Sequence, residues 1–101
     1  MKKQETKLQE ACQNNLDRLG IYNINTSEVG AGVLDGFFIY KGVFVATEYK
    51  RKEKGKDKGG RESEAQKISR EFIIRCGGKA IIVKDWLDIE RTLREIDRGI
   101  K

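Results

Sequence analysis

The chain has 101 residues, two cysteines, no histidine and a formal net charge of +5 at pH 7. Without histidine it cannot form a Ser-His-Asp or Cys-His nucleophile system, and two cysteines are too few for a four-cysteine zinc site. The basic excess favours a polyanionic partner, nucleic acid before membrane. Any chemistry must therefore use carboxylates, lysines, hydroxyls or amides, with a hard metal ion rather than an organic cofactor.

The length predicts one domain spanning residues 1–101. No apolar run approaches the ~20 residues that cross a bilayer, so no membrane partner is expected. The N-terminus turns polar after two lysines and does not resemble a signal peptide. We therefore expect a cytoplasmic protein.

The first predicted element is a helix over residues 2–19, which Gly20 ends. Its apolar side chains recur at helical spacing and form one stripe. The stripe consists of Leu8, Ala11, Cys12, Leu16 and Leu19. Glu5 lies on the same stripe, where its carboxylate can interact favourably with the helix dipole. The alternative is that Glu5 points across a sheet toward other carboxylates.

A β-hairpin is predicted in the middle of the chain, after a short strand over residues 21–25 and a glycine-containing loop over 26–32. Residues 37–40 and 43–47 are rich in β-branched and aromatic side chains, with Lys41-Gly42 between them as the turn.

Three polar residues flank this hairpin: Asp35, Glu48 and Lys50. Because the start of one antiparallel strand lies beside the end of the next, Asp35 should meet Glu48. Glu48 and Lys50 are two residues apart, so they should share one face. Two carboxylates suit Mg²⁺, and a nearby lysine can orient a water or neutralise charge on phosphorus. The alternative is three ordinary charges at strand ends, because this spacing also arises by chance in charged chains.

A basic run follows the hairpin directly. Residues 51–61 contain lysine, arginine, glycine and acidic residues and no apolar side chain, which predicts a mobile loop. Such a run can be a solvated charged segment, but its position beside the three polar residues favours contact with a phosphodiester backbone. The residues expected to bind nucleic acid are Arg51, Lys52, Lys54, Lys56, Lys58 and Arg61.

The last part of the chain predicts a helix, a strand and a helix. Ser63 and Gln66 form a capping-box pattern at the start of the first helix, and Gly77-Gly78 ends it. Its expected buried face consists of Ala65, Ile68, Phe72, Ile73 and Cys76. Cys12 and Cys76 are both expected as small buried side chains in a reducing compartment, with a disulfide left open.

Residues 80–84 form a short apolar run typical of a buried strand, expected to pair parallel with the strand over 43–49. Asp85 can cap a final helix whose buried stripe includes Trp86, Ile89, Leu93 and Ile96. The predicted fold is α/β, in the order α-β-β-β-α-β-α, with a mixed central sheet flanked by helices.

This arrangement resembles the PD-(D/E)xK nuclease superfamily, and its details resemble the VRR-NUC family within it. The resemblance covers about residues 4–97 and rests on the order and spacing of short motifs. These are Glu5-Thr6-Lys7-Leu8-Gln9, Gly20, Asn25, Gly32-Val33-Leu34-Asp35, Glu48-Tyr49-Lys50, Ser63-Glu64-Ala65-Gln66 and Gly77-Gly78. Two features depart from the family pattern: Leu34 stands where proline is usual, and the basic run is longer than expected.

The resemblance implies a single nuclease domain with a restriction-endonuclease-like core and a Mg²⁺- or Mn²⁺-dependent phosphodiesterase activity. Asp35 and Glu48 are implied as metal ligands, joined by the backbone carbonyl of Tyr49. Lys50 is implied to position or activate the attacking water, Glu5 to complete the acidic site, and Gln66 to sit beside Lys50. Small stand-alone members of the family resemble virus or phage proteins that act as homodimers on branched DNA such as four-way junctions. The resemblance therefore implies a protein of a bacterial or infected host cell.

We therefore expect a structure-selective DNA endonuclease. The rival interpretation is a non-catalytic nucleic-acid-binding module, which the charge and the basic run fit equally well. The polar residues around the hairpin and the lack of an RNA-binding aromatic motif argue against it. A third interpretation is a small interaction protein with an incidental acidic cluster.

Overall fold

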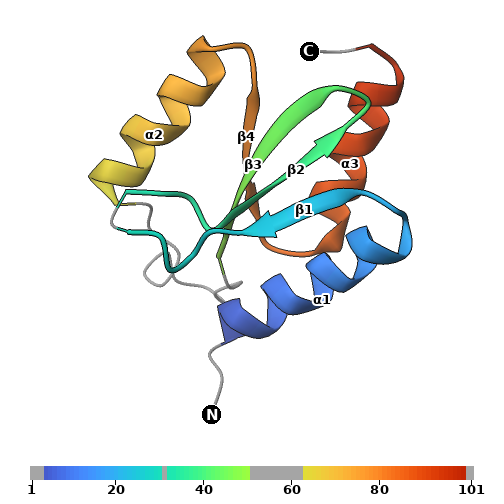
Figure 1. The fold of residues 1–101 in the computed structure, drawn as a ribbon, viewed down its shortest axis with the longest axis horizontal. Helices are drawn as coiled ribbons and strands as arrows, with labels where there is room; N and C mark the ends of the chain where they lie inside the picture. Colours follow the sequence, from blue (N-terminus) through green and yellow to red (C-terminus); the bar gives the residue numbers. More distant parts are fainter. Residues whose placement is uncertain (1–3, 31, 51–62, 100–101) are drawn as a thin grey trace, which may run out of the picture.

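The computed structural model describes residues 4–30, 32–50 and 63–99. Its elements are α1 (Gln4–Arg18), β1 (Tyr22–Asn25), β2 (Gly36–Tyr40), β3 (Val43–Tyr49), α2 (Glu64–Arg75), β4 (Lys79–Val83) and α3 (Trp86–Asp97). The predicted α/β class and element order are confirmed (Figure 1). Among these helices, none combines the length and the apolar character needed to cross a membrane.

The strands form one mixed sheet in the order β1-β2-β3-β4. β1, β2 and β3 are antiparallel neighbours, while β4 runs parallel to β3 as the intervening helix predicted. Lys41 and Gly42 have φ values of 50° and 81°, and positive φ at both residues is what a two-residue type I′ hairpin turn requires. The register pairs Gly36 with Thr47. The residue before Gly36 and the residue after Thr47 therefore lie at the same end of the hairpin.

One face of the sheet, here called the inner face, packs against α1 and α3. Its buried side chains alternate with residues of the opposite face, as strand geometry requires. The resulting core consists of Phe38, Val45, Tyr49 and Val83 from the sheet, Cys12 and Leu16 from α1, Ile21, and Ile89, Leu93 and Ile96 from α3. The predicted stripes of both helices are thus largely confirmed, but Ala11 is exposed within α1 and Leu19 is exposed beyond its end.

The other face, here called the outer face, is covered only in part by α2. Figure 1 shows α2 and α3 on opposite sides of the sheet. A Cβ atom added to Gly78 would lie 3.0 Å from Ile73 Cγ2 and 3.4 Å from Phe44 Cδ1, so the C-terminal end of α2 borders β3. Near its start, α2 contacts the loop before β2 through the hydrogen bond from Ser69 Oγ to the carbonyl of Gly32.

The predicted buried face of α2 is wrong. Not one residue of this helix is buried, and Ile68 and Phe72 are each 60% exposed. Of the other residues predicted for this face, Ala65 and Cys76 are also exposed, and Ile73 is half-buried. The helix presents its Ser69 and Ile73 side to the protein, which leaves the neighbouring Ile68 and Phe72 side in solvent. The burial predicted for Cys76 fails with it, whereas Cys12 is buried and both thiols are free.

Candidate active site

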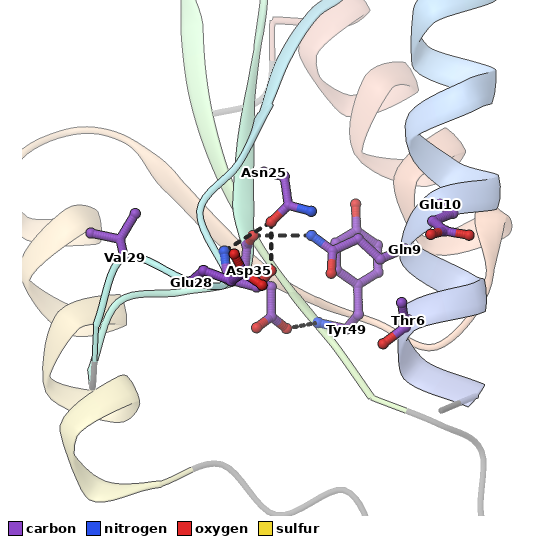
Figure 2. A pocket seen from close by; sticks show the side chains of 9 residues that line it. Thr6, Gln9, Glu10, Asn25, Glu28, Val29, Asp35 and Tyr49 are labelled. Atoms are coloured by element: carbon purple, nitrogen blue, oxygen red, sulfur yellow. Dashed lines mark hydrogen bonds between the residues drawn. The ribbon is translucent and has the colours of Figure 1, made fainter. Parts of the chain in front are cut away.

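Asp35 is held at the start of β2 by contacts from three separate segments. Its carbonyl oxygen accepts hydrogen bonds from Thr26 N at 2.8 Å and from Gln9 Nε2 at 3.0 Å. Its carboxylate oxygen Oδ2 accepts a hydrogen bond from the backbone N–H of Tyr49 at 2.8 Å, shown in Figure 2. The chain approaches β1 closely here, because a Cβ on Gly36 would lie 2.8 Å from the carbonyl oxygen of Ile24. Asp35 therefore lies against the segment that carries Glu48 and Lys50.

Glu48 and Lys50 form a buried ion pair at the end of β3. The Glu48 side chain has no solvent exposure and that of Lys50 has 11%, with Lys50 Nζ 3.5 Å from Glu48 Oε2. Alternation along β3 puts Glu48 on the outer face, opposite the buried Tyr49. Removing two charges from water costs on the order of several kcal/mol per ion, and the attraction between them seldom exceeds that cost. A buried pair of this kind is therefore not expected to add much to stability.

An open cleft lies in front of Asp35, with a volume of about 620 Å³. It separates the first turns of α1 from the loop after β1, and Figure 2 shows the side chains that surround it. Its lining residues are Thr6, Gln9, Glu10, Asn25, Ser27, Glu28, Val29, Asp35 and Tyr49. Asp35 and Tyr49 line this cleft, whereas Glu48 and Lys50 do not.

Gln9 is a site residue to which sequence reasoning gave no role. It is only 6% exposed although it carries a polar amide. The sequence did hold a signal, because Gln9 precedes Cys12 by three residues and Leu16 by seven, which puts an amide on the buried stripe of α1. A buried amide needs a partner, and only the structure shows that this partner is the backbone of Asp35.

Tyr49 contributes its main chain to the site and its ring to the core. The phenol is buried on the inner face, and burial raises the pKa of Tyr49 to about 12. The hydroxyl therefore stays protonated at any physiological pH, which excludes a phenolate role. The predicted metal contact of the Tyr49 carbonyl oxygen remains a prediction.

The remaining predicted site residues are placed less directly. Gln66 lies in the first turn of α2, where it closes the predicted capping box with Ser63. Its Oε1 lies 3.4 Å from Ser63 N and 3.3 Å from Ser63 Oγ. Its second predicted role beside Lys50 stays a prediction. Glu5 lies within α1, but its side chain is outside the described part of the structure. The basic run over 51–61 also lies outside the described residues.

The donor set at this end of the sheet suits a hard divalent cation. Asp35 and Glu48 supply carboxylate oxygens, and Mg²⁺ is commonly held by one or two carboxylates together with water and substrate phosphate. Across the described residues, no group of three or more Asp, Glu, Cys or His side chains gathers as a self-contained metal cage. Asp35 and Glu48 are the described residues that could hold such a cation.

Comparison with known proteins adds no family assignment. The sequence matches no protein-family model and no curated protein. The resemblance to the VRR-NUC family therefore remains a prediction from the sequence motifs.

Proposed function

We propose that this protein is a Mg²⁺- or Mn²⁺-dependent endonuclease that selects DNA by structure and has a restriction-endonuclease-like, VRR-NUC-type core. One observation carries the proposal: Asp35, which lines an open cleft, accepts a hydrogen bond from the end of β3, where the buried Glu48–Lys50 pair lies. Carboxylates next to a buried lysine are costly for folding, and hydrolysis of a phosphodiester uses both groups.

Each residue has a distinct role in the proposed reaction. Asp35 and Glu48 hold the divalent cation, which when bound polarises a phosphoryl oxygen and lowers the pKa of water. Lys50, held against Glu48, orients the attacking water and balances charge that develops on the phosphate. Gln9 and Thr26 fix the main chain of Asp35, so the carboxylate needs little rearrangement when substrate arrives.

The proposed assembly is a homodimer, since one domain carries one site and symmetric cutting of a branched duplex needs two. The exposed apolar side of α2 supports this assembly. Glu64 lies in the first turn of α2 and Arg75 in the last. An antiparallel pairing of two copies about Ile68 and Phe72 brings Glu64 of each copy toward Arg75 of the other. Apolar contact and opposite charge then favour the same arrangement.

We propose that the basic run over residues 51–61 binds the phosphodiester backbone. Its lysines directly follow Lys50 in the sequence, so bound phosphate would lie near the scissile bond. Neutralising Lys52, Lys54, Lys56 and Lys58 should flatten the salt dependence of binding, since each lost phosphate contact changes the slope by about 0.7–0.9.

The test is cleavage of end-labelled four-way junction, flap, single-stranded and duplex DNA with Mg²⁺, Mn²⁺ or EDTA. Metal-dependent cutting of branched DNA that is lost in Asp35→Ala supports the proposal. Equal cutting of every substrate retains a nuclease but removes the selectivity for structure. Binding without cutting in any metal establishes the non-catalytic nucleic-acid-binding module instead.

A further inference from the structure

Three aromatic rings form a row across the outer face of the sheet. Tyr22 of β1, Phe37 of β2 and Phe44 of β3 come from three neighbouring strands. The ring centroids of Tyr22 and Phe37 are 6.5 Å apart, and those of Phe37 and Phe44 are 5.0 Å apart with 27° between their planes. The row forms because the register places these residues on one face: Tyr22 is opposite Ile39, and Ile39 is opposite Phe44.

The two outer rings of this row are open to solvent in the described part of the molecule, and Phe37 between them is half-buried. Tyr22 is 62% exposed and Phe44 is 37% exposed, and Ile24 and Ile39 on the same face are exposed as well. The inner face differs in exposure, because Phe38, which follows Phe37 along β2, is fully buried. Cross-strand aromatic pairs do stabilise sheets, but a ring as exposed as that of Tyr22 adds little to that effect.

We propose that the Tyr22–Phe37–Phe44 row is a stacking platform for the unpaired bases of single-stranded nucleic acid. Bases of a single strand stack on exposed aromatic rings, whereas those of a duplex are occupied with one another. The formal net charge of +5 favours a polyanion over an apolar protein surface. Arg75, in the last turn of α2, adds a cation at the end of that helix that borders Phe44.

The platform lies on the same face of the sheet as Glu48. Phe44, Ala46 and Glu48 alternate onto the same face of β3. At ~3.3 Å per residue, Phe44 and Glu48 are about 13 Å apart along the strand. Ala46 and Glu48 are themselves buried, so a single strand on the row lies on the Glu48 side of the sheet without touching Glu48. For a nuclease, this placement favours branched DNA with a single-stranded arm as the substrate. This link to cleavage rests on the proposed nuclease function, whereas the binding does not.

The experiment measures binding in EDTA, where no cleavage occurs. Fluorescence anisotropy compares the full chain on labelled oligothymidine, oligouridine and a duplex of equal length. Tyr22→Leu and Phe44→Leu remove a ring while they keep an apolar side chain. Each should weaken binding to single strands about 5- to 150-fold, the range for loss of one base-stacking contact, and leave duplex binding unchanged. Leu87→Ala, which trims an equally exposed apolar side chain on α3, is the matched control and should bind like the parent chain.

A second measurement uses the parent chain, so it does not depend on whether a variant folds. The parent chain is irradiated with single strands that contain 5-iodouracil, and the adducts are mapped by mass spectrometry. Adducts on Tyr22, Phe37 or Phe44 support the platform, with the DNA and RNA arms showing which strand it takes. Adducts only elsewhere, or an equal loss of binding in Leu87→Ala, overturn it. Loss of a dimer in Tyr22→Leu without any loss of single-strand binding assigns this face to a second copy instead.

The two proposals fail separately. Stacking adducts without metal-dependent cleavage retain the platform and remove the nuclease. Cleavage without stacking adducts retains the nuclease and removes the platform.

Discussion

The two faces of the sheet differ in what their apolar residues do. The inner face is sealed by α1 and α3 around Phe38, Val45 and Val83, which have no exposure. The outer face buries Glu48 yet leaves Tyr22, Ile39 and Phe44 open, and its helix α2 has no buried residue. The proposed chemistry and binding both lie on the outer face, while the inner face holds the apolar core. Substitutions on the two faces should therefore separate activity from stability.

The largest expected effect is on catalysis and comes from the outer face. Glu48→Gln keeps the shape of the side chain but removes the charge that pairs with Lys50 and that would hold the metal. The rate of cleavage in Mg²⁺ should fall by more than roughly 100-fold, which is the upper loss seen when a residue that only orients a metal ligand is removed. Cleavage rates on a flap substrate, with far-UV circular dichroism as the folding control, measure it. Full turnover by this variant would show that Glu48 takes no part in the reaction.

The next effect is on stability and comes from the inner face. Ile89→Ala in α3 removes a fully buried side chain and should cost about 2–5 kcal/mol in the free energy of unfolding. The same change at Ile68 in α2 should stay within ~0.5 kcal/mol in dilute protein, because that side chain is exposed. Urea denaturation of both variants measures the difference. Equal losses would mean that α2 is packed as tightly as α3, and the comparison of the two faces would fail.

Gln9 links the two faces, since it extends from α1 to the main chain of Asp35. Gln9→Leu removes this hydrogen bond and should weaken Mn²⁺ binding about 10- to 100-fold, as for other partners that orient a ligand. Isothermal titration calorimetry at fixed pH measures the affinity. Gln13→Leu, one turn further along α1, is the matched control. An unchanged affinity in Gln9→Leu would make Gln9 a structural residue only.

The smallest expected effect lies at the rim, where Asp97 of α3 meets Lys41 and Tyr40 of the hairpin. The hydrogen bond from Lys41 holds the pKa of Asp97 below its ordinary value of 3.8. Its contribution to stability is therefore complete above pH 3.8 and is lost as pH falls through the lowered pKa. Asp97→Asn should lower the melting temperature slightly at neutral pH and leave it unchanged at the acid end. A drop of equal size at every pH would assign the effect to packing.

Local signals in the sequence determined most of the fold. The pattern of apolar residues predicted the helices and strands of the described chain. The Ser63–Gln66 capping box and the glycines marked the ends of helices. The helix between β3 and β4 predicted that these two strands are parallel. These features depend on neighbouring residues, so one sequence is enough to read them. The hairpin argument also indicated that Asp35 and Glu48 lie at one end of the sheet.

Tertiary structure alone decided what covers each face. Periodicity shows that α2 has an apolar side, but whether that side is buried depends on which other segment lies against it. The contact between Gln9 and Asp35 joins residues 26 positions apart. The aromatic row likewise needs the register of three strands, and no sequence motif records it. Long-range packing fixed these features because burial and register depend on distant segments, whereas capping and periodicity depend on adjacent ones.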